Sequence, residues 1–394
     1  MTEPVPAFEF TYDPGQIVFG RGSGGTLDTT LDEHGFDRAL IACGANVGNN
    51  DAVMEPITTG LGDRLIGIFD ETTPEKSILT ILDGAEFIRE TDPDVLIALG
   101  SGSTMNVTRG MAAVAALDAD RDTILETTEE TGSLPTPPAE TDILPIVVVP
   151  TTLAGADISP GGGVGMPDGS TARLSDDRLI ASILCYDPEL FVTTPTSVLA
   201  SSAMNGFNKG IETIYSRRTN PISTGHAVQG LGHFRLGLPT LCDRDLSDGA
   251  IDNAVAGIIL VQYGRFTNII HTFGNGISYN HDVQQGTVHG IMAPAVLRYV
   301  FEQTDASRRQ IADALDIDHA GLDDGAVADD IVTVVTEIRD ALGLPSTLRS
   351  IPDLDRSDLD TLADAIVANH KHARNPPGVD PDVAAIRSIL DEAY

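Results

Sequence analysis

Three of the nine histidines lie close together, at His271, His281 and His289, in a segment rich in glycine and polar residues. Clustered imidazoles can supply acid–base groups or metal ligands. The alternative for each histidine taken singly is a structural role. No HExxH pattern occurs, so the segment by itself does not identify a metal.

Lysine is almost absent from the chain, which contains only Lys76, Lys209 and Lys371. Lys209 lies in a mostly apolar stretch, residues 204–215, with helical spacing of its apolar side chains. In such a helix Asn205 would lie one turn from Lys209. A lysine retained there could be functional; the alternative is an ion pair with Glu212 at i+3.

Two polar loops follow runs of apolar residues. The first, residues 100–106, reads Gly-Ser-Gly-Ser-Thr-Met-Asn and precedes an apolar helical stretch. Its glycines would let the backbone approach a phosphate at the start of the helix. No GKS or GKT follows, so it is not a Walker A loop, and an ordinary strand-to-helix turn is the alternative.

The second loop, residues 150–160, begins Pro-Thr-Thr-Leu-Ala-Gly-Ala-Asp. The hydroxyl groups of Thr151 and Thr152 could hold a pyrophosphate or a ribose. Loops at the carboxyl ends of neighbouring parallel strands form a ligand-binding crevice. Capping of a following helix is the alternative for these threonines.

The elements that must position these loops alternate between strands and helices in the first half of the chain. Apolar runs typical of buried parallel strands lie at 38–44, 64–69, 94–100, 144–150 and 178–186. A helical period spans 77–90, and the acidic tract 118–142 is expected to be an exposed loop or lid and not a domain linker. This predicts a doubly wound, Rossmann-like α/β domain over 1–194 and a mainly helical domain over 195–394.

The charge balance excludes some partners. With 24 basic and 58 acidic residues the net charge is −34, so nucleic acid and membrane surfaces would be repelled. Because the sequence is also rich in periodic apolar residues, we interpret the acidity as salt (halophilic) adaptation and not as disorder. Three widely spaced cysteines and the lack of a long apolar run lead us to expect a soluble protein of a reducing cytoplasm.

With these segments in hand, the chain resembles the iron-containing (group III) alcohol dehydrogenases, and among them most the maleylacetate reductase branch. The similar segments span most of the chain and include PTTLAGAD at 150–157, which is similar to the PTTYAGSE of the reductases. The others are 17–22, the strand into Gly44, 100–106, 187–190, 204–212, 271–290 and 375–376.

The resemblance implies an α/β dinucleotide-binding domain, a helical domain of the dehydroquinate synthase type, and an active site in the cleft between them. It also implies a homo-oligomer. The cofactor-binding positions that it implies are Gly100, Gly102 and Ser103 at the pyrophosphate, Thr151, Thr152 and Leu153 at the nicotinamide, and Arg173 near a cofactor-contacting lysine of the family.

Three departures concern the cofactor. Gly44 lies where an NAD-preferring member has Asp, and a glycine leaves room for a 2′-phosphate, so either NAD or NADP is permitted. Ser101 replaces a glycine of the phosphate-binding loop. Arg109 stands in place of the usual lysine.

The metal site departs further. Family members bind iron or zinc through one Asp and three His, and the resemblance puts Asn205 and Lys209 at the first two positions. His271 and His289 take the remaining two if an insertion separates them, whereas an ungapped register would place Asn275 instead of His271. An ammonium repels a dication and an amide is a poor ligand, so we expect no bound metal.

The expected reaction is therefore metal-independent hydride transfer between NAD(P) and a small carbonyl, enone or alcohol. Lys209 would polarise the carbonyl oxygen, Asn205 would donate a hydrogen bond, and His271 or His289 would relay the proton. A maleylacetate-like oxo-acid is the expected substrate, and Arg173, Arg217 or Arg218 could bind its carboxylates.

Two other functions fit the same residues. One is a nucleotide-binding homologue that has lost dehydrogenase activity, which the degenerate metal positions suggest. The other is a redox-neutral enzyme related to dehydroquinate synthase, in which bound NAD is recycled. Turnover with a net change in NADH separates the oxidoreductase from both.

Overall fold

The computed structural model describes residues 7–11, 15–244, 247, 249–264, 266–369 and 374–394. Lys371 lies outside the described residues. The chain forms two compact units. One comprises Tyr12–Thr152 and Ala156–Thr194, and the other comprises Met1–Thr11, Leu153–Gly155 and Pro195–Tyr394. We call them the α/β unit and the helical unit.

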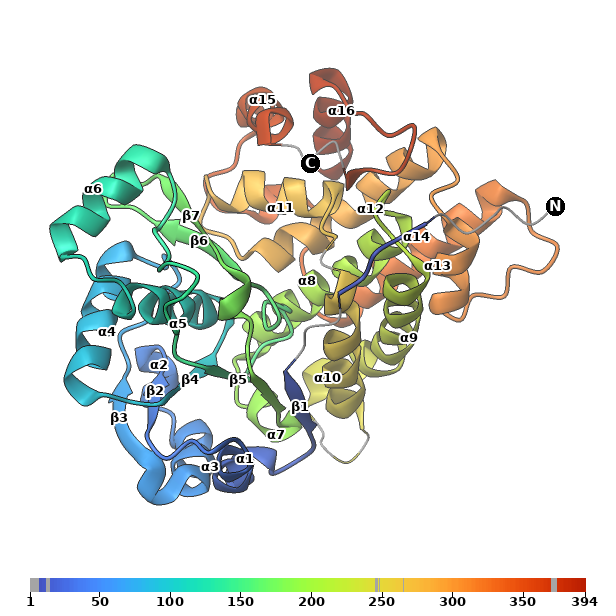
Figure 1. The fold of residues 1–394 in the computed structure, drawn as a ribbon. Coiled ribbons are helices and arrows are strands. Elements are labelled where there is room, and N and C mark those ends of the chain that lie inside the picture. Colours follow the sequence, from blue (N-terminus) through green and yellow to red (C-terminus); the bar gives the residue numbers. More distant parts are fainter. Residues whose placement is uncertain (1–6, 12–14, 245–246, 248, 265, 370–373) are drawn as a thin grey trace. The chain divides into compact units, whose positions relative to one another are not determined.

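The α/β unit is built on a six-stranded parallel sheet with the strand order β1-β8-β5-β4-β2-β3 (Figure 1). Five of the strands were predicted from apolar runs, and the confirmed fold class is the expected doubly wound one. The strands are β1 (Gln16–Phe19), β2 (Ala39–Ala42), β3 (Leu65–Phe69), β4 (Val95–Gly100), β5 (Ile146–Pro150) and β8 (Ile183–Tyr186).

Both faces of this sheet are covered, which explains the nearly continuous apolar runs in its central strands. On one face, alternate residues such as Ile41, Ile97 and Val147 share a core with α1 (Leu27–His34) and α3 (Asp51–Leu61). The other face packs against α4 (Ile78–Thr91) and α5 (Gly102–Ala115). The carboxyl ends of β4 and β5 thus lead into the two polar loops.

The acidic tract 118–142 is not wholly a loop as expected, because it contains α6 (Arg121–Thr131). Asp120 caps this helix by accepting a hydrogen bond from the amide of Thr123, and Gly132 ends it in a left-handed conformation. Ile124 and Thr128 are its buried residues. A two-stranded antiparallel hairpin, β6 (Gly161–Gly165) and β7 (Thr171–Ser175), also escaped prediction.

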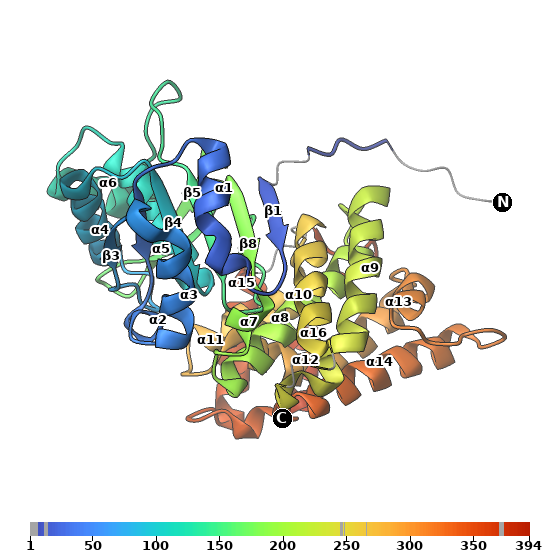
Figure 2. The same ribbon diagram turned by 90° about the horizontal axis from the view of Figure 1, so that it is seen from below.

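In the helical unit, α8 (Thr196–Tyr215) contacts α9 (Pro221–Gly237), α10 (Ala250–Val261), α11 (Ile269–Ser278) and α12 (Gln285–Gln303). Figure 2 shows α9 and α10 side by side. The unit also contains α13 (Arg308–Ala314), α14 (Asp324–Ala341), α15 (Leu359–Asn369) and α16 (Val383–Ala393). Among the described residues, no helix combines the length and the apolar character needed to cross a membrane.

Close contact between α8 and α12 depends on glycine. A Cβ atom on Gly286, at the start of α12, would lie 1.8 Å from the carbonyl oxygen of Ser201 on α8. The backbones of the two helices therefore approach closely at this point. This close approach sets the spacing between two nearby polar residues, Asn205 of α8 and Gln285 of α12.

Candidate active site

A cluster of polar side chains lies inside the helical unit, on α8, α11 and α12. Asn205 and Glu212 come from α8, His271 from the first turn of α11, and Gln285 and His289 from α12. Asn205 and Glu212 are seven positions apart, which is two helical turns, so they lie on the same side of α8. We call these five residues the polar cluster.

Glu212 is completely buried and it fixes His271. Its carboxylate accepts hydrogen bonds from the backbone amides of Asn268, Ile270 and His271, at 2.7, 2.6 and 3.2 Å. Its Oε2 atom also lies 2.5 Å from Nδ1 of His271. The carboxylate therefore caps the start of α11 and orients the imidazole ring.

Burial raises the pKa of Glu212 to about 7, while the hydrogen bonds from the amides of α11 act in the opposite direction. The nearby charge of His289, when that ring is protonated, also lowers it. Near neutral pH the group is thus close to its titration midpoint. Small changes in its surroundings will change its charge.

A chain of side-chain hydrogen bonds continues from the other ring nitrogen of His271. Nε2 of His271 lies 3.2 Å from Oδ1 of Asn205, whose Nδ2 donates to Oε1 of Gln285 at 3.3 Å. Gln285 in turn donates to Oδ1 of Asn275 at 2.6 Å. Asn275 is thus three hydrogen bonds away from His271, and it is His271 that lies beside Asn205.

His289 is completely buried, and its ring centroid lies 4.3 Å from that of His271. Neither of its ring nitrogens has a hydrogen-bond partner within the described part of the chain. Burial, together with the charges of His271 and Lys209, holds the pKa of His289 well below its usual value. It is therefore a neutral imidazole with unused hydrogen-bonding capacity, in contact with the ring that Glu212 orients.

Lys209 lies on the same helix but its ammonium is directed at backbone oxygens. Nζ donates to the carbonyl of Ala154 at 2.6 Å and to that of Gly155 at 2.5 Å. Two of its three N–H donors are therefore engaged by the loop that follows β5. His281, the third clustered histidine, lies in the loop between α11 and α12.

These residues do not fit a divalent metal. The donors at the four positions are an amide, an ammonium and two imidazoles, and Oδ1 of Asn205 already contacts Nε2 of His271. The Lys209 charge acts on His289 and would repel a cation there. In the described ranges there is no group of three or more His, Cys, Asp or Glu side chains that could hold a metal.

The predicted pyrophosphate loop opens α5 in the α/β unit. The helix begins at Gly102, and Ser101 provides no side-chain cap, so the amides of the first turn remain available to an anion. The hydroxyl group of Ser101 lies 2.8 Å from that of Ser103. A Cβ atom on Gly102 would lie 3.0 Å from Cβ of Ala156, so a larger residue would narrow this cradle. The residues present fit a pyrophosphate.

Gly44 follows β2, and Gly100 ends the neighbouring strand β4. A hydrogen bond of 2.9 Å joins the hydroxyl groups of Thr72 and Thr104 beside them. A Cβ atom on Gly44 would lie 2.9 Å from the carbonyl oxygen of Thr72. A side chain at this position would therefore displace the backbone that follows β3.

Thr151 and Thr152 are buried at the end of β5, where the amide of Thr151 donates to the carbonyl of Gly100. No helix follows them, since the chain runs through turns into β6, so they are not helix caps. Leu153 belongs to the helical unit and its amide donates to Oγ of Ser202. Arg173 is exposed on β7.

Arg109, which replaces a lysine of the family pattern, is fully buried in the α/β unit. It donates to the carbonyl oxygens of Asp157 and Leu179. The side chain of Asp157 in turn accepts a hydrogen bond from the hydroxyl group of Tyr186. Arg109 therefore ties α5 to the loop after β5.

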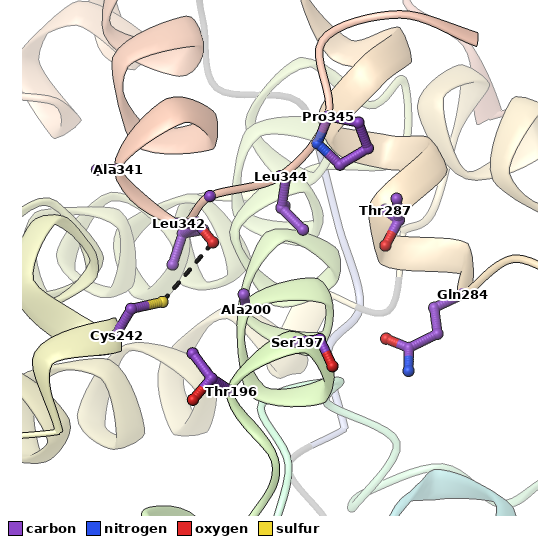
Figure 3. A pocket seen from close by; sticks show the side chains of 11 residues that line it. Thr196, Ser197, Ala200, Cys242, Gln284, Thr287, Ala341, Leu342, Leu344 and Pro345 are labelled. Atoms are coloured by element: carbon purple, nitrogen blue, oxygen red, sulfur yellow. Dashed lines mark hydrogen bonds between the residues drawn. The ribbon is translucent and has the colours of Figure 1, made fainter. Parts of the chain in front are cut away.

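A separate cavity of about 460 Å³ lies at the amino-terminal ends of α8 and α12. Figure 3 shows Ser197 and Ala200 of α8 near Leu344, with Gln284 and Thr287 on the other side. Sγ of Cys242 contacts the carbonyl oxygen of Leu342 at its edge. The cavity shares no residue with the polar cluster, although Gln284 directly precedes Gln285.

The sequence of the α/β unit matches the family described as iron-containing alcohol dehydrogenase over residues 14–188. Residues 199–394 match the carboxy-terminal domain of the Fe-containing alcohol dehydrogenase family. The chain belongs to the iron-containing alcohol dehydrogenase family. It is accordingly an NAD(P)-dependent oxidoreductase, as the sequence predicted.

Two curated relatives match nearly the whole length of this iron-containing alcohol dehydrogenase homologue. A maleylacetate reductase of Rhizobium sp. (strain MTP-10005) is 24% identical over 98% of this chain and 97% of the relative. A 4-hydroxybutyrate dehydrogenase of Cupriavidus necator is 27% identical over 98% and 99%. These matches confirm the predicted likeness to the maleylacetate reductase branch.

Several solved structures have the same fold as this chain. A 1,3-propanediol oxidoreductase aligns with a TM-score of 0.88 at 19% identity, covering 98% of this chain and 100% of the other. The maleylacetate reductase of Rhizobium sp. strain MTP-10005 aligns with a TM-score of 0.76 at 22% identity, covering 100% and 99%. A sulfoacetaldehyde reductase from Bifidobacterium kashiwanohense in complex with NAD⁺ aligns at 0.85 and 18%, covering 98% and 99%.

Glu212 and Gln285 were not predicted as members of the cluster. Glu212 was considered only as an ion-pair partner of Lys209, although a carboxylate in an otherwise apolar helix was a signal of burial with partners. Gln285 carried no such signal, because its partner Asn205 is 80 positions away in the sequence.

Proposed function

We propose that the protein is a metal-independent reductase that uses NADH or NADPH to reduce a small oxo-acid of the maleylacetate type. The observation that carries this proposal is that Glu212 orients His271, while Asn205 and Lys209 stand where the family pattern has an Asp and a His ligand. The maleylacetate reductases among the relatives support the choice of an oxo-acid.

Reduction of a carbonyl needs a hydride at carbon and a proton at oxygen. A bound nicotinamide supplies the hydride. We assign the cofactor pyrophosphate to Gly100, Gly102 and Ser103, where the first turn of α5 offers its amides. Thr151 and Thr152, at the end of β5, and Leu153 remain the residues proposed for the nicotinamide. The sulfoacetaldehyde reductase of the same fold, solved in complex with NAD⁺, supports a dinucleotide here.

The proton comes from Nε2 of His271 in this proposal. Asn205 donates through Nδ2 to Gln285 and so turns Oδ1 toward His271, which then donates from Nε2. In this proposal the reacting ring carries a proton on each nitrogen, with Nδ1 donating to the carboxylate of Glu212 and Nε2 donating to Asn205. It gives its Nε2 proton to the oxygen that becomes negative as the hydride arrives, and the product is an alcohol.

The side-chain amide of Asn205 can reorient after this proton transfer. Once Nε2 has lost its proton it becomes an acceptor, and a turned Asn205 amide would donate to it through Nδ2. His289, held neutral beside His271, adds no second positive charge to the site. Its unused ring nitrogens are the remaining polar atoms proposed to meet the substrate or water.

Arg173, Arg217 and Arg218 are exposed and remain candidates for binding substrate carboxylates. The acidic composition motivates the further proposal that the enzyme works in a salt-rich cytoplasm. A homo-oligomeric state is proposed on the resemblance alone.

The test is a turnover assay on purified, metal-analysed protein in molar KCl, with NADH and NADPH, against maleylacetate, other short oxo-acids and short aldehydes. We expect oxidation of the reduced cofactor with maleylacetate at substoichiometric metal. Tight dinucleotide binding without turnover would instead favour the inactive homologue. Catalysis without net NADH change would favour the redox-neutral enzyme.

His271→Gln tests the assigned proton donor. We expect kcat to fall by about 10²- to 10⁴-fold while cofactor binding is kept. His319→Gln is the matched control, because His319 is a histidine of the same unit that pairs with Asp313 away from the cluster. Equal activity of His271→Gln and wild type would remove His271 from the mechanism.

A further inference from the structure

The three residues after Thr152, namely Leu153–Gly155, are packed into the helical unit although Thr152 and Ala156 on either side belong to the α/β unit. We call these three residues the tongue. Leu153 is completely buried. The tongue directly continues the backbone of Thr151 and Thr152, the residues proposed for the nicotinamide.

One side of α8 is shaped to receive the tongue. Ser202, Gly206 and Lys209 follow one another at i, i+4 and i+7, so they lie on one face of the helix. The amide of Leu153 donates to Oγ of Ser202 at 3.1 Å. A Cβ atom on Gly206 would lie 2.4 Å from the carbonyl oxygen of Leu153, so only glycine allows this approach.

Helix α10 encloses the tongue from another side. Gly155 has φ +67°, a left-handed conformation that favours glycine. A Cβ atom there would lie 2.7 Å from Cδ1 of Ile258 and 3.0 Å from Cγ of Gln262. The backbone of the tongue is therefore confined between two helices.

Lys209 completes this enclosure. Its ammonium bridges the consecutive carbonyl oxygens of Ala154 and Gly155, at 2.6 and 2.5 Å. Hydrogen bonds from a charged donor are shorter and stronger than neutral ones. An ammonium can bring separate N–H groups to two adjacent oxygens, because it is a compact charge with three donors. The contact thus fixes the orientation of both peptide groups.

We propose that Lys209 is a positioning residue for the cofactor site: its ammonium locks the tongue on α8 and so holds the backbone that presents Thr151 and Thr152. This rests on the proposed function only in naming the nicotinamide as what those threonines meet. Lys209 is at once part of the tongue-binding face and one turn from Asn205. It organises the loop at a position where the family places a metal ligand, instead of polarising the carbonyl as the sequence suggested.

The first test is Lys209→Met, which keeps the length of the side chain and removes its charge. Hydrogen exchange of peptides covering residues 150–158 should become at least about tenfold faster, because the tongue loses its charged anchor. The dissociation constants of NADH and NADPH should rise by about tenfold. The value of kcat at saturating cofactor should fall by less than about threefold.

Ser202→Ala removes the hydrogen bond to the amide of Leu153, at the other end of the tongue. It tests the proposal independently if Lys209→Met does not fold. It should shift exchange and cofactor binding in the same direction by a smaller factor, since a neutral hydrogen bond is lost. Lys76→Met is the matched control, because Lys76 belongs to the α/β unit and its backbone is hydrogen-bonded to Thr73 and Gly165. It should leave the exchange of residues 150–158 unchanged.

The proposal is overturned if tongue exchange in Lys209→Met and Ser202→Ala equals that of wild type. It is also overturned if Lys209→Met lowers kcat by orders of magnitude with cofactor binding unchanged, which would place the ammonium at the reacting carbonyl. Failure of the proposed function has a different signature, namely wild type that binds neither NADH nor NADPH. The exchange measurement still decides the role of Lys209 in that case.

Discussion

The Nδ1 atom of His271 lies 2.5 Å from Oε2 of Glu212, inside the helical unit and shielded from solvent. The same carboxylate accepts hydrogen bonds from the backbone amides of Ile270 and His271, in the first turn of α11. One side chain therefore sets both the position of the helix and the orientation of the ring. The ring must then interact with Asn205 through Nε2.

The burial of Glu212 makes the stability of the protein depend on pH. Its pKa is raised to about 7 in the folded state from about 4.5 in the unfolded chain, so the folded state binds the extra proton between these values. Its contribution to the free energy of unfolding is therefore complete below about pH 4.5 and is lost as the pH rises toward 7. The loss is on the order of 3 kcal/mol.

Glu212→Gln isolates this contribution, because glutamine is neutral at every pH and has nearly the same shape. We expect the difference in unfolding free energy between wild type and variant to change steadily from pH 5 to about pH 8, with wild type losing stability relative to the variant. Denaturant unfolding at a series of pH values measures it. Parallel curves for the two proteins would contradict the assigned burial effect.

The sequence was sufficient for the core of the α/β unit. Its central strands are buried on both faces, so residues such as Leu96 and Ile97 are both apolar and the run is unmistakable. The hairpin β6–β7 lacked such a signal, because Gly161, Gly162 and Gly163 have no β-propensity. It is placed by close contacts instead: a Cβ atom on Gly162 would lie 2.1 Å from Nδ2 of Asn106.

The candidate site was only partly predictable, because part of its geometry depends on contacts between residues far apart in the sequence. Motif positions identified Asn205, Lys209, His271 and His289 as a group, and three of them meet in the polar cluster. The direction of the Lys209 side chain depends on where residues 154 and 155 come to lie, which is a tertiary contact about 55 positions away in sequence. No local pattern encodes such a contact.

Restoring the ligand types of the family should create metal binding. In Asn205→Asp with Lys209→His, a carboxylate and an imidazole replace the amide and the ammonium beside His271 and His289. We expect the double variant to retain close to one equivalent of zinc or iron after dialysis, and wild type to retain far less. Elemental analysis of both proteins, prepared in parallel, measures the difference.

Wild-type turnover should also survive a chelator, because none of the proposed steps passes through a metal. The single variants are the controls for the double one, since each restores only one ligand and should gain little affinity. A wild-type protein that holds stoichiometric iron or zinc and loses activity with the chelator would show that the donor set has been misjudged.

The contact between α8 and α12 gives a prediction about stability. Gly286→Ala would place a methyl group 1.8 Å from the carbonyl oxygen of Ser201, so the helices must separate. We expect a loss of about 1–3 kcal/mol in the free energy of unfolding, together with a lower kcat, because the adjacent Gln285 would move away from Asn205. Denaturant unfolding and the turnover assay measure the two effects.

Gly225→Ala is the matched control. Gly225 lies within α9, and a Cβ atom there would have no neighbour within 4 Å. Alanine should therefore stabilise the helix by up to about 1 kcal/mol and leave kcat unchanged. The packing argument fails if both alanine variants have the stability of wild type.

The excess of 58 acidic over 24 basic residues predicts that stability rises with salt. Like charges on the folded surface repel, and added KCl screens them, since the Debye length falls from about 10 Å at 0.1 M to about 3 Å at 1 M. We expect the thermal midpoint to rise with KCl, with most of the gain below about 1 M. Sucrose at matched osmolality is the control, because it stabilises proteins without screening charge. If the thermal midpoint rises equally with sucrose and with KCl, repulsion among the carboxylates does not limit the stability of the fold. The acidity would then need another explanation.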